Sequence, residues 1–368
     1  MPSAVDVTFF AQVRERLARG GDVALATIIA REGTGPRDPG AMFAVGSDGT
    51  LLGALSSGCL EAAIVDEARD VLRGGTARIR TYGPEGEALD DRTFGALTCG
   101  GSVAVLIERL ERNLWDAFAA AAEAGRPVAW ARALDCGTAV VEPHQTMGNF
   151  QPRRLFAKVI DLAHTMLTAH GSGVTRIDCI DGCDGPLIVQ TVAARPLLVV
   201  VGAVDFAAAT LDVGRLLGFA CVLLDARPAF VTALRFPQAD RIEVGWPHET
   251  FTRLGPDDRT AVVVLTHDEK FDVPFLKVAL SSPAYYVGAL GSRRTNDRRL
   301  EALRACGVDE AMLARLHAPI GLDIGARAPA EVAVAIGAEI VAARNQRSGG
   351  LLRDADGPIG GRHSLVSA

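Results

Sequence analysis

Apolar residues in the second half of the chain gather in short runs, and each run ends at a glycine or a polar residue. Leu197–Val201 ends at Gly202, and residues 221–224 end on Asp225. Between them, apolar positions recur with helical spacing as far as Gly218. Short branched runs predict strands buried on both faces, as in a parallel sheet. Strand, glycine turn, helix, strand and then an acidic residue is the order of a dinucleotide-binding βαβ unit.

The glycine turn of this unit departs from the usual fingerprint. The pattern G-x-G-x-x-G would place a second glycine where this chain has Val204, and Asp205 follows. A β-branched residue keeps the backbone away from a pyrophosphate, and a carboxylate repels phosphate unless it caps the helix. Gly202 and Asp225 are candidate cofactor-binding residues, but NAD binding in the ordinary manner is disfavoured.

Two further apolar runs, residues 260–266 and 285–290, are also followed by groups that carry chemistry. In an open parallel sheet, ligands sit beyond the carboxyl ends of the strands. A glycine, a hydroxyl and a guanidinium at the start of a helix also suit an anion. We therefore expect a binding site at this edge. A glycine-rich loop before the last helix contributes a further cofactor-binding candidate, Asp323. The candidates are Asp225, His267, Asp268, Ser292, Arg293 and Asp323.

The first half of the chain predicts an α+β region that is internally duplicated. Residues 127–192 repeat, as a degenerate copy, the order of strands and helix found in residues 23–108. Three segments of the first copy have no counterpart in the second, namely residues 33–40, 56–61 and 99–101. A fold that can be copied without these segments does not need them, so they are candidates for ligand binding.

The chemistry of these three segments suits a soft or anionic ligand. Cys59 is expected near a helix N-terminus, where the dipole and free N–H groups favour a thiolate. Cys99 precedes two glycines, and the two thiols could converge on a metal or a sulfur. The plainer alternatives are a small buried cysteine and an ordinary turn between strands. The candidates here are Arg37, Gly58, Cys59, Cys99 and Gly100.

The length of 368 residues allows two or three domains. We expect an N-terminal domain at 1–112, its degenerate copy at 113–195, a parallel-sheet domain at 196–345 and a flexible tail at 346–368. The net charge of −6 argues against a nucleic-acid surface. No signal-peptide pattern or membrane span is expected. Seven cysteines without paired spacing predict neither a disulfide framework nor a zinc site, which fits a reducing cytoplasm.

Several stretches are long and distinctive: EGTGPRDPGAM (32–42), LLGALSSGCLEAA (51–63), LTCGG (97–101), YYVGALGSRRTNDRRLEALRACGV (285–308) and LHAPIGLDIGARAPAEVAVAIGAEIVAARN (316–345). In these stretches the chain resembles the xanthine dehydrogenase accessory proteins of the XdhC/CoxI type. The resemblance implies an α/β fold, with a C-terminal Rossmann-like parallel-sheet domain beside the N-terminal α+β region.

The resemblance also implies a function, that of a chaperone without turnover of its own. Such a protein would bind the pterin-based molybdenum cofactor and protect it while its terminal sulfur is installed. It would then insert the cofactor into a hydroxylase of the xanthine dehydrogenase or CO dehydrogenase type. Cys59 and Cys99 would face the molybdenum or its sulfur, and Arg37 would help to hold the anion. The implied partners are an apo-hydroxylase and a sulfurtransferase, and a cytoplasmic homodimer is expected.

Two other functions stay open from the residues alone. One is an NAD-dependent oxidoreductase that uses the βαβ unit, with His267 as acid or base. The broken glycine fingerprint argues against it, because Val204 stands where the second glycine belongs. The other is a scaffold for hydroxylase assembly, in which Cys59 and Cys99 would be dispensable.

Overall fold

The fold was analysed in a computed structural model. It describes residues 7–33, 37–56, 58, 60–83, 101–169, 171–178, 180, 183 and 185–354. The chain divides into two compact units, Met1–Ala194 and Arg195–Ala368, and each is considered by itself. Among the described residues, no helix is long and apolar enough to cross a membrane.

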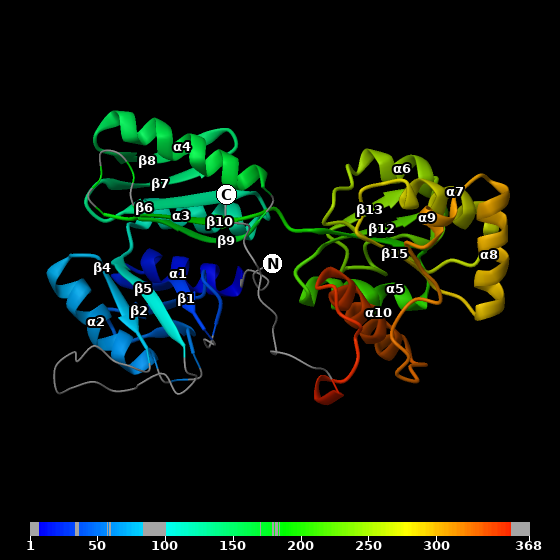
Figure 1. Cartoon of the computed structure of the whole chain (residues 1–368), viewed down its shortest axis with the longest axis horizontal. Coiled ribbons are helices and arrows are strands. Elements are labelled where there is room, and N and C mark those ends of the chain that lie inside the picture. Colours follow the sequence, from blue (N-terminus) through cyan, green and yellow to red (C-terminus); the bar gives the residue numbers. More distant parts are fainter. Residues whose placement is uncertain are drawn as a thin grey trace. The chain divides into compact units, whose positions relative to one another are not determined.

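The first unit begins with an antiparallel sheet covered by a helix (Figure 1). Its elements are α1 (Val7–Ala18), β1 (Val23–Glu32), β2 (Met42–Gly46), β3 (Leu51–Gly53), α2 (Glu61–Gly74), β4 (Arg78–Tyr82) and β5 (Ser102–Arg109). The strands lie in the order β3-β2-β1-β5-β4. Helix α2 has apolar positions at helical spacing, and its buried Ile64, Ala68 and Val71 pack against residues of β1 and β5.

A second sheet in the same unit repeats this arrangement. Its elements are α3 (Arg112–Glu123), β6 (Val128–Ala133), β7 (Gly137–Glu142), β8 (Gln145–Phe150), α4 (Arg153–Thr168), β9 (Gly173–Ile177) and β10 (Leu187–Val192). The order β8-β7-β6-β10-β9 matches the first sheet strand for strand, which confirms the predicted duplication. Strand β8 was not predicted, since most of its side chains are exposed and polar and give no period-two pattern. Phe10 of α1 and Trp115 and Phe118 of α3 share one core with Trp130.

The expectation that the cysteines form no disulfide is wrong for one pair. Cys136 and Cys183 are disulfide-bonded, with their Cα atoms 5.9 Å apart and a separation of 47 positions in the chain. Cys136 lies in the turn between β6 and β7, and the pairing of β6 with β10 brings Ala133 opposite Leu187. This strand pairing brings together two segments that no local spacing of cysteines connects.

The second unit is a parallel sheet with helices on both faces (Figure 1). Its elements are β11 (Leu197–Val201), α5 (Asp205–Leu216), β12 (Ala220–Asp225), η1 (Pro228–Phe230), β13 (Arg241–Val244), α6 (Pro247–Arg253), β14 (Ala261–Val264), α7 (Glu269–Leu280), β15 (Tyr286–Ala289), α8 (Arg293–Ala305), α9 (Glu310–Leu313), β16 (Leu316–His317), α10 (Pro329–Arg344) and η2 (Leu352–Asp354). The order β13-β12-β11-β14-β15-β16 reverses between β11 and β14, as in dinucleotide-binding sheets. The predicted Rossmann-like fold is thus confirmed.

The turn after β11 is held by the carboxylate that ends β12. Gly202 has φ +109°, and a Cβ atom there would lie 2.6 Å from Thr266 Cγ2, so only glycine fits without strain. Asp225 Oδ2 accepts a hydrogen bond from the Ala203 N–H at 2.7 Å, and Arg227 donates to both carboxylate oxygens. Burial alone would raise the pKa of Asp225, but the hydrogen bonds from Arg227 and Ala203 outweigh it and lower that pKa. Asp205 is the first helical residue and Val204 is the N-cap, so Asp205 does not cap α5.

The lowered pKa of Asp225 predicts a pH-dependent contribution to stability. We expect Asp225→Asn to destabilise the protein at pH 7, because an amide cannot neutralise Arg227. A depressed native pKa gives stability that is complete above the unfolded-state pKa of about 3.9 and is lost as the pH falls through the native pKa. The difference in urea midpoint between wild type and Asp225→Asn should therefore shrink below about pH 4. Asp258→Asn, at an exposed carboxylate, is the matched control and should follow wild type at each pH. A difference for Asp225→Asn that stays constant down to about pH 2 would contradict the assignment.

Candidate functional site

The carboxyl edge of the parallel sheet collects most of the predicted site residues of the second unit. Asp225 ends β12, His267 and Asp268 follow β14, and Ser292 follows β15. All strand pairs in this sheet are parallel, so these ends share one edge. Arg293, the first residue of α8, and Asp323, in the loop before α10, are exposed.

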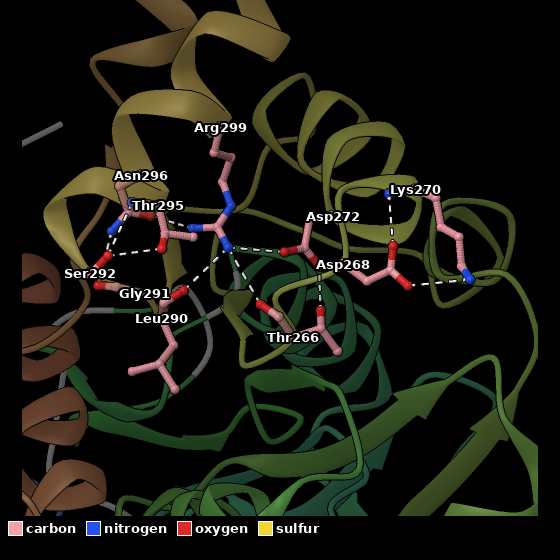
Figure 2. A network of polar contacts seen from close by, with 10 residues as sticks. All are labelled: Thr266, Asp268, Lys270, Asp272, Leu290, Gly291, Ser292, Thr295, Asn296 and Arg299. Atoms are coloured by element: carbon pink, nitrogen blue, oxygen red, sulfur yellow. Dashed lines mark hydrogen bonds and ion pairs between the residues drawn. The ribbon is translucent and has the colours of Figure 1, made fainter.

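A buried ion pair joins the loops that follow β14 and β15 (Figure 2). Arg299 of α8 lies 2.9 Å from Asp272 of α7, and the two side chains are 3% and 2% exposed. The Arg299 guanidinium also donates to the carbonyl oxygens of Thr266 at 3.4 Å and Leu290 at 3.2 Å. Asp272 in turn accepts from the Thr266 hydroxyl. One cation thus fixes the ends of two neighbouring strands relative to each other.

The same network continues to the start of α8. Arg299 donates to the Asn296 side chain, whose amide donates to the Gly291 carbonyl at 3.2 Å (Figure 2). The Ser292 hydroxyl accepts from the Thr295 N–H at 3.1 Å and lies 2.9 Å from the Thr295 hydroxyl. Ser292 is therefore the N-cap of α8, and its hydroxyl is already committed to the helix.

Asp268 has the same capping position at the start of α7. Its carboxylate accepts from the Lys270 N–H at 3.2 Å and lies 3.3 Å from the Lys270 ammonium. His267, the residue before it, is exposed. The two candidates His267 and Arg293 thus face solvent at the edge of a rigid frame, where side chains can meet a ligand without breaking a contact that holds the fold.

Asp225 is already saturated by the protein. Its oxygens accept from the Ala203 N–H, the Arg227 N–H and two guanidinium nitrogens of Arg227, all at 2.7–2.9 Å. A carboxylate has about four lone-pair sites, so a ribose hydroxyl could bind only by displacing one of these donors. The hydrogen bonds within the protein therefore occupy the carboxylate that usually binds the ribose in a dinucleotide-binding sheet.

A second polar cluster holds the loop that contains Asp323. Glu339 of α10 accepts from the Tyr286 hydroxyl at 2.6 Å and from the Gly321 N–H at 2.7 Å, and it lies 3.1 Å from His317 Nδ1. Burial alone would raise the pKa of Glu339, but these hydrogen bonds, led by the one from His317, lower it. Burial and the nearby Glu339 carboxylate raise the pKa of Tyr286. The cluster therefore fixes a charged carboxylate beneath the exposed loop.

In the first unit, a turn is held tightly on both sides of position 59. The Glu61 carboxylate accepts from the N–H groups of Leu55 at 2.9 Å and Ser56 at 2.7 Å, and from the Ser56 hydroxyl. The Ser56 hydroxyl oxygen accepts from the N–H groups of Gly58 at 3.0 Å and Leu60 at 3.1 Å. Burial alone would raise the pKa of Glu61, but the hydrogen bonds from Ser56 and Leu55 outweigh it and lower that pKa, so the carboxylate stays charged.

Strand register places the loop with Arg37 and the start of β5 at the same end of the sheet as this turn. Glu32, at the end of β1, pairs with Ser102, at the start of β5, and Gly53, at the end of β3, pairs with Phe43. The exposed Arg37 lies in the loop that joins β1 to β2 at this end. Cys59, Cys99 and Gly100 lie outside the described residues, but the residues that flank them, Gly58, Leu60 and Gly101, are described.

Several side chains that organise these sites were missed from the sequence. They are Asp272, Arg299 and Glu339. Each resembles an ordinary helix or loop residue in its local sequence, and Asp272 and Arg299 lie 27 positions apart. A usable signal was the presence of single charges on otherwise apolar helix faces, as at Asp272 between Phe271 and Val273. Within the described ranges, no group of three or more His, Cys, Asp or Glu side chains could hold a metal ion.

The buried ion pair predicts a large difference between two arginine substitutions. Arg299→Met leaves the Asp272 carboxylate buried without a cation and should cost about 3–5 kcal/mol of unfolding free energy. Arg304→Met is the matched control, since Arg304 pairs with Glu310 at the exposed surface and its loss should change the unfolding free energy far less. The double variant Asp272→Asn/Arg299→Met should recover part of the loss. Urea unfolding of the three variants checks this, and equal costs for the two single variants would refute it.

Comparisons with known proteins cover both units. Residues 16–83 match the XdhC and CoxI family, and residues 198–340 match the XdhC Rossmann domain. The chain is 25% identical over 330 residues to a probable xanthine dehydrogenase subunit of Bacillus subtilis (strain 168), which covers 88% of this chain and 94% of that protein. It is 26% identical over 332 residues to the molybdenum cofactor insertion chaperone PaoD of Escherichia coli (strain K12), with 90% and 86% covered.

A solved structure supports the fold. A protein named xanthine dehydrogenase from Bacillus halodurans superposes with a TM-score of 0.68 at 24% identity, over 92% of this chain and 96% of that one. The match at residues 16–83 contains Arg37 and the turn around position 59, and the match at residues 198–340 contains the whole carboxyl-edge network. On these matches, which confirm the resemblance seen in its motifs, the chain belongs to the XdhC and CoxI family.

Proposed function

We propose that this chain binds the molybdenum cofactor as a cargo and inserts it into the apo form of a molybdenum hydroxylase. The observation that carries the proposal is the turn at residues 55–61, where Ser56 and Glu61 hold the backbone on both sides of position 59. The turn lies within the XdhC and CoxI match, and the degenerate copy of the same fold lacks it. One relative is named a molybdenum cofactor insertion chaperone, which supports a maturation role for this chain.

The chemistry of the cargo suits this end of the first sheet. A molybdenum–sulfur centre is soft and favours thiolate ligands, so Cys59 and Cys99 are the proposed contacts, with Gly58 and Gly100 allowing close approach. The cofactor is also anionic, and the exposed Arg37 would provide a guanidinium at the same end of the sheet. Glu61 would act as a positioning residue, because its carboxylate is used to hold the turn and not to meet the ligand.

The finer steps of the proposal follow from the family. The chain would shield the cofactor while a sulfurtransferase installs the terminal sulfur, and would then release it to a hydroxylase of the xanthine dehydrogenase or CO dehydrogenase type. It would work as a homodimer in the cytoplasm, carry the cofactor without using it, and have no catalytic residue of its own. The alternative of an NAD-dependent oxidoreductase is less well supported, because Asp225 is saturated by Ala203 and Arg227.

Cofactor retention tests the proposal. The chain is loaded with molybdenum cofactor, desalted, and the retained pterin is oxidised and measured by fluorescence. We expect near-stoichiometric retention by wild type, and affinity at least about tenfold lower for Cys59→Ala, a loss of about 1.4 kcal/mol or more. Cys306→Ala is the matched control, since Cys306 is an exposed free cysteine of the other unit and its loss should leave retention unchanged.

A second variant separates the thiol from the turn that holds it. Glu61→Ala keeps Cys59 but removes the acceptor of the Leu55 and Ser56 N–H groups, so retention should also fall while the far-UV spectrum of the protein is kept. Wild-type retention by a folded Cys59→Ala protein would exclude the ligand role of Cys59. If wild type itself retained no pterin, the carrier function would be refuted and the scaffold alternative would take its place.

A further inference from the structure

Three aromatic rings gather at the carboxyl edge of the parallel sheet. Trp246 follows β13, His248 lies in the first turn of α6, and Phe271 lies in the first turn of α7. The ring centroids of Trp246 and Phe271 are 5.2 Å apart, and those of Trp246 and His248 are 6.0 Å apart. We call Trp246, His248 and Phe271 the aromatic shelf.

The shelf is fixed in place and yet open to solvent. Trp246 is flanked by two rings and followed by Pro247, which limits its freedom before any ligand binds, yet this residue is 46% exposed. The other two tryptophans of the chain, Trp115 and Trp130, are 0% and 2% exposed and belong to the core of the first unit. A large ring that is held by packing and still exposed is suited to stacking, because little side-chain entropy remains to be lost.

Charged groups lie beside the shelf. The Lys270 ammonium lies 4.7 Å from the centroid of the Phe271 ring and 3.3 Å from the Asp268 carboxylate. The Arg227 guanidinium is attracted electrostatically by Asp268 as well as by Asp225. A flat ligand on the shelf would therefore lie beside the Lys270 ammonium and the Asp268 carboxylate. A purely apolar partner would gain nothing from these charges.

A further exposed ring of this unit, that of Phe230, is less available. The Phe230 ring is covered by two guanidinium groups, that of Arg227 at 4.7 Å and that of Arg235 at 5.9 Å. Trp246 therefore offers the better aromatic face for a ligand. It also lies where open parallel sheets bind nucleotides, at the carboxyl ends of the strands, although the usual ribose acceptor Asp225 is closed here.

We propose that the aromatic shelf binds a planar heteroaromatic ring, stacked on Trp246. Lys270 and Asp268 would contact the polar edge of this ring, and Lys270 alone would contact an attached phosphate. Such a ring has two possible sources, a nucleobase and the pterin of the cofactor, and both share the stacking chemistry. This inference deepens the proposed function and rests on it, since it assigns the second unit a part in holding the cargo. The site differs from the thiol site of the first unit in its ligand chemistry, so the two can be tested separately.

The test uses the full chain and simple probes that contain no molybdenum. GMP, CMP and AMP represent the nucleobase source, 6-carboxypterin represents the pterin source, and ribose 5-phosphate is the control without an aromatic ring. Affinities are measured by isothermal titration calorimetry, and quenching of the tryptophan emission locates binding, because only Trp246 is accessible among the three tryptophans. We expect at least one aromatic probe to bind and quench, and ribose 5-phosphate to do neither.

Two substitutions and one control variant test whether the probe binds at Trp246. Trp246→Ala should weaken binding of that probe by about 5- to 150-fold, the range found when stacked aromatic residues are removed, whereas Trp246→Phe should keep most of the affinity. Leu234→Ala, at a 92% exposed apolar residue in the segment between β12 and β13, should bind as wild type. Binding of nucleotides alone assigns the shelf to a nucleobase, and binding of the pterin alone assigns it to the pterin.

Two results would overturn the inference. In the first, a folded Trp246→Ala protein binds every aromatic probe with the affinity of wild type. In the second, the wild-type protein binds no aromatic probe at millimolar concentration. Either can occur while Cys59-dependent cofactor retention is intact. Conversely, the wild-type protein could bind an aromatic probe and yet retain no molybdenum cofactor. That result would refute the carrier function but not ring binding by the aromatic shelf.

Discussion

The buried pair of Asp272 and Arg299 is the contact on which the candidate site of the second unit depends. Moving both charges out of water costs several kcal/mol per ion, so the pair is a weak source of stability. What it provides is geometry, since Arg299 contacts Asp272, the Thr266 carbonyl, the Leu290 carbonyl and Asn296 at once. The ends of β14 and β15, and the caps of α7 and α8 that follow them, are thereby set in one arrangement. The groups that remain exposed at this edge, among them His267 and Arg293, stand on that frame.

The first unit uses the same device on a smaller scale. The Glu61 carboxylate accepts from the N–H groups of Leu55 and Ser56 in the turn before α2, and the Ser56 hydroxyl accepts from those of Gly58 and Leu60. A negatively charged side chain at a helix N-terminus is favourable in itself, so the turn gains order at little cost. The duplicated sheet provides an internal comparison, because α4 and its neighbouring strands keep the fold without any counterpart of this turn. This difference between the two copies supports the proposal that the turn serves a ligand.

The two units therefore carry groups of different chemistry. The first provides a held backbone, a guanidinium and, in its sequence, two thiols beside glycines. The second provides a rigid sheet edge with capped helices, an aromatic shelf and a closed acid in place of the usual ribose acceptor. Under the proposed function, a soft metal centre matches the first set of groups, and a flat heterocycle with a phosphate matches the second set. An enzyme that moves hydride between NAD and a substrate has a use for neither the thiols nor a saturated Asp225.

The sequence by itself determined the classes of structure and the edge at which the second site lies. Short branched runs that end on Gly202, Asp225 and His267 predict buried parallel strands with polar carboxyl ends. Both features can be predicted because the burial of a strand and its end depend on residues that are neighbours in the sequence. The repeat of strand and helix order likewise predicted the duplicated sheets. Tertiary structure decided the rest. It determines that the Asp225 carboxylate accepts its hydrogen bonds from Ala203 and Arg227, and that Cys136 forms a disulfide with Cys183. It also determines that Arg299 and Glu339 hold loops that are far from them in the chain. Hydrogen bonds and ion pairs between distant segments depend on strand pairing and helix packing, which bring those segments together. A local pattern of residues does not show which distant segments will come into contact.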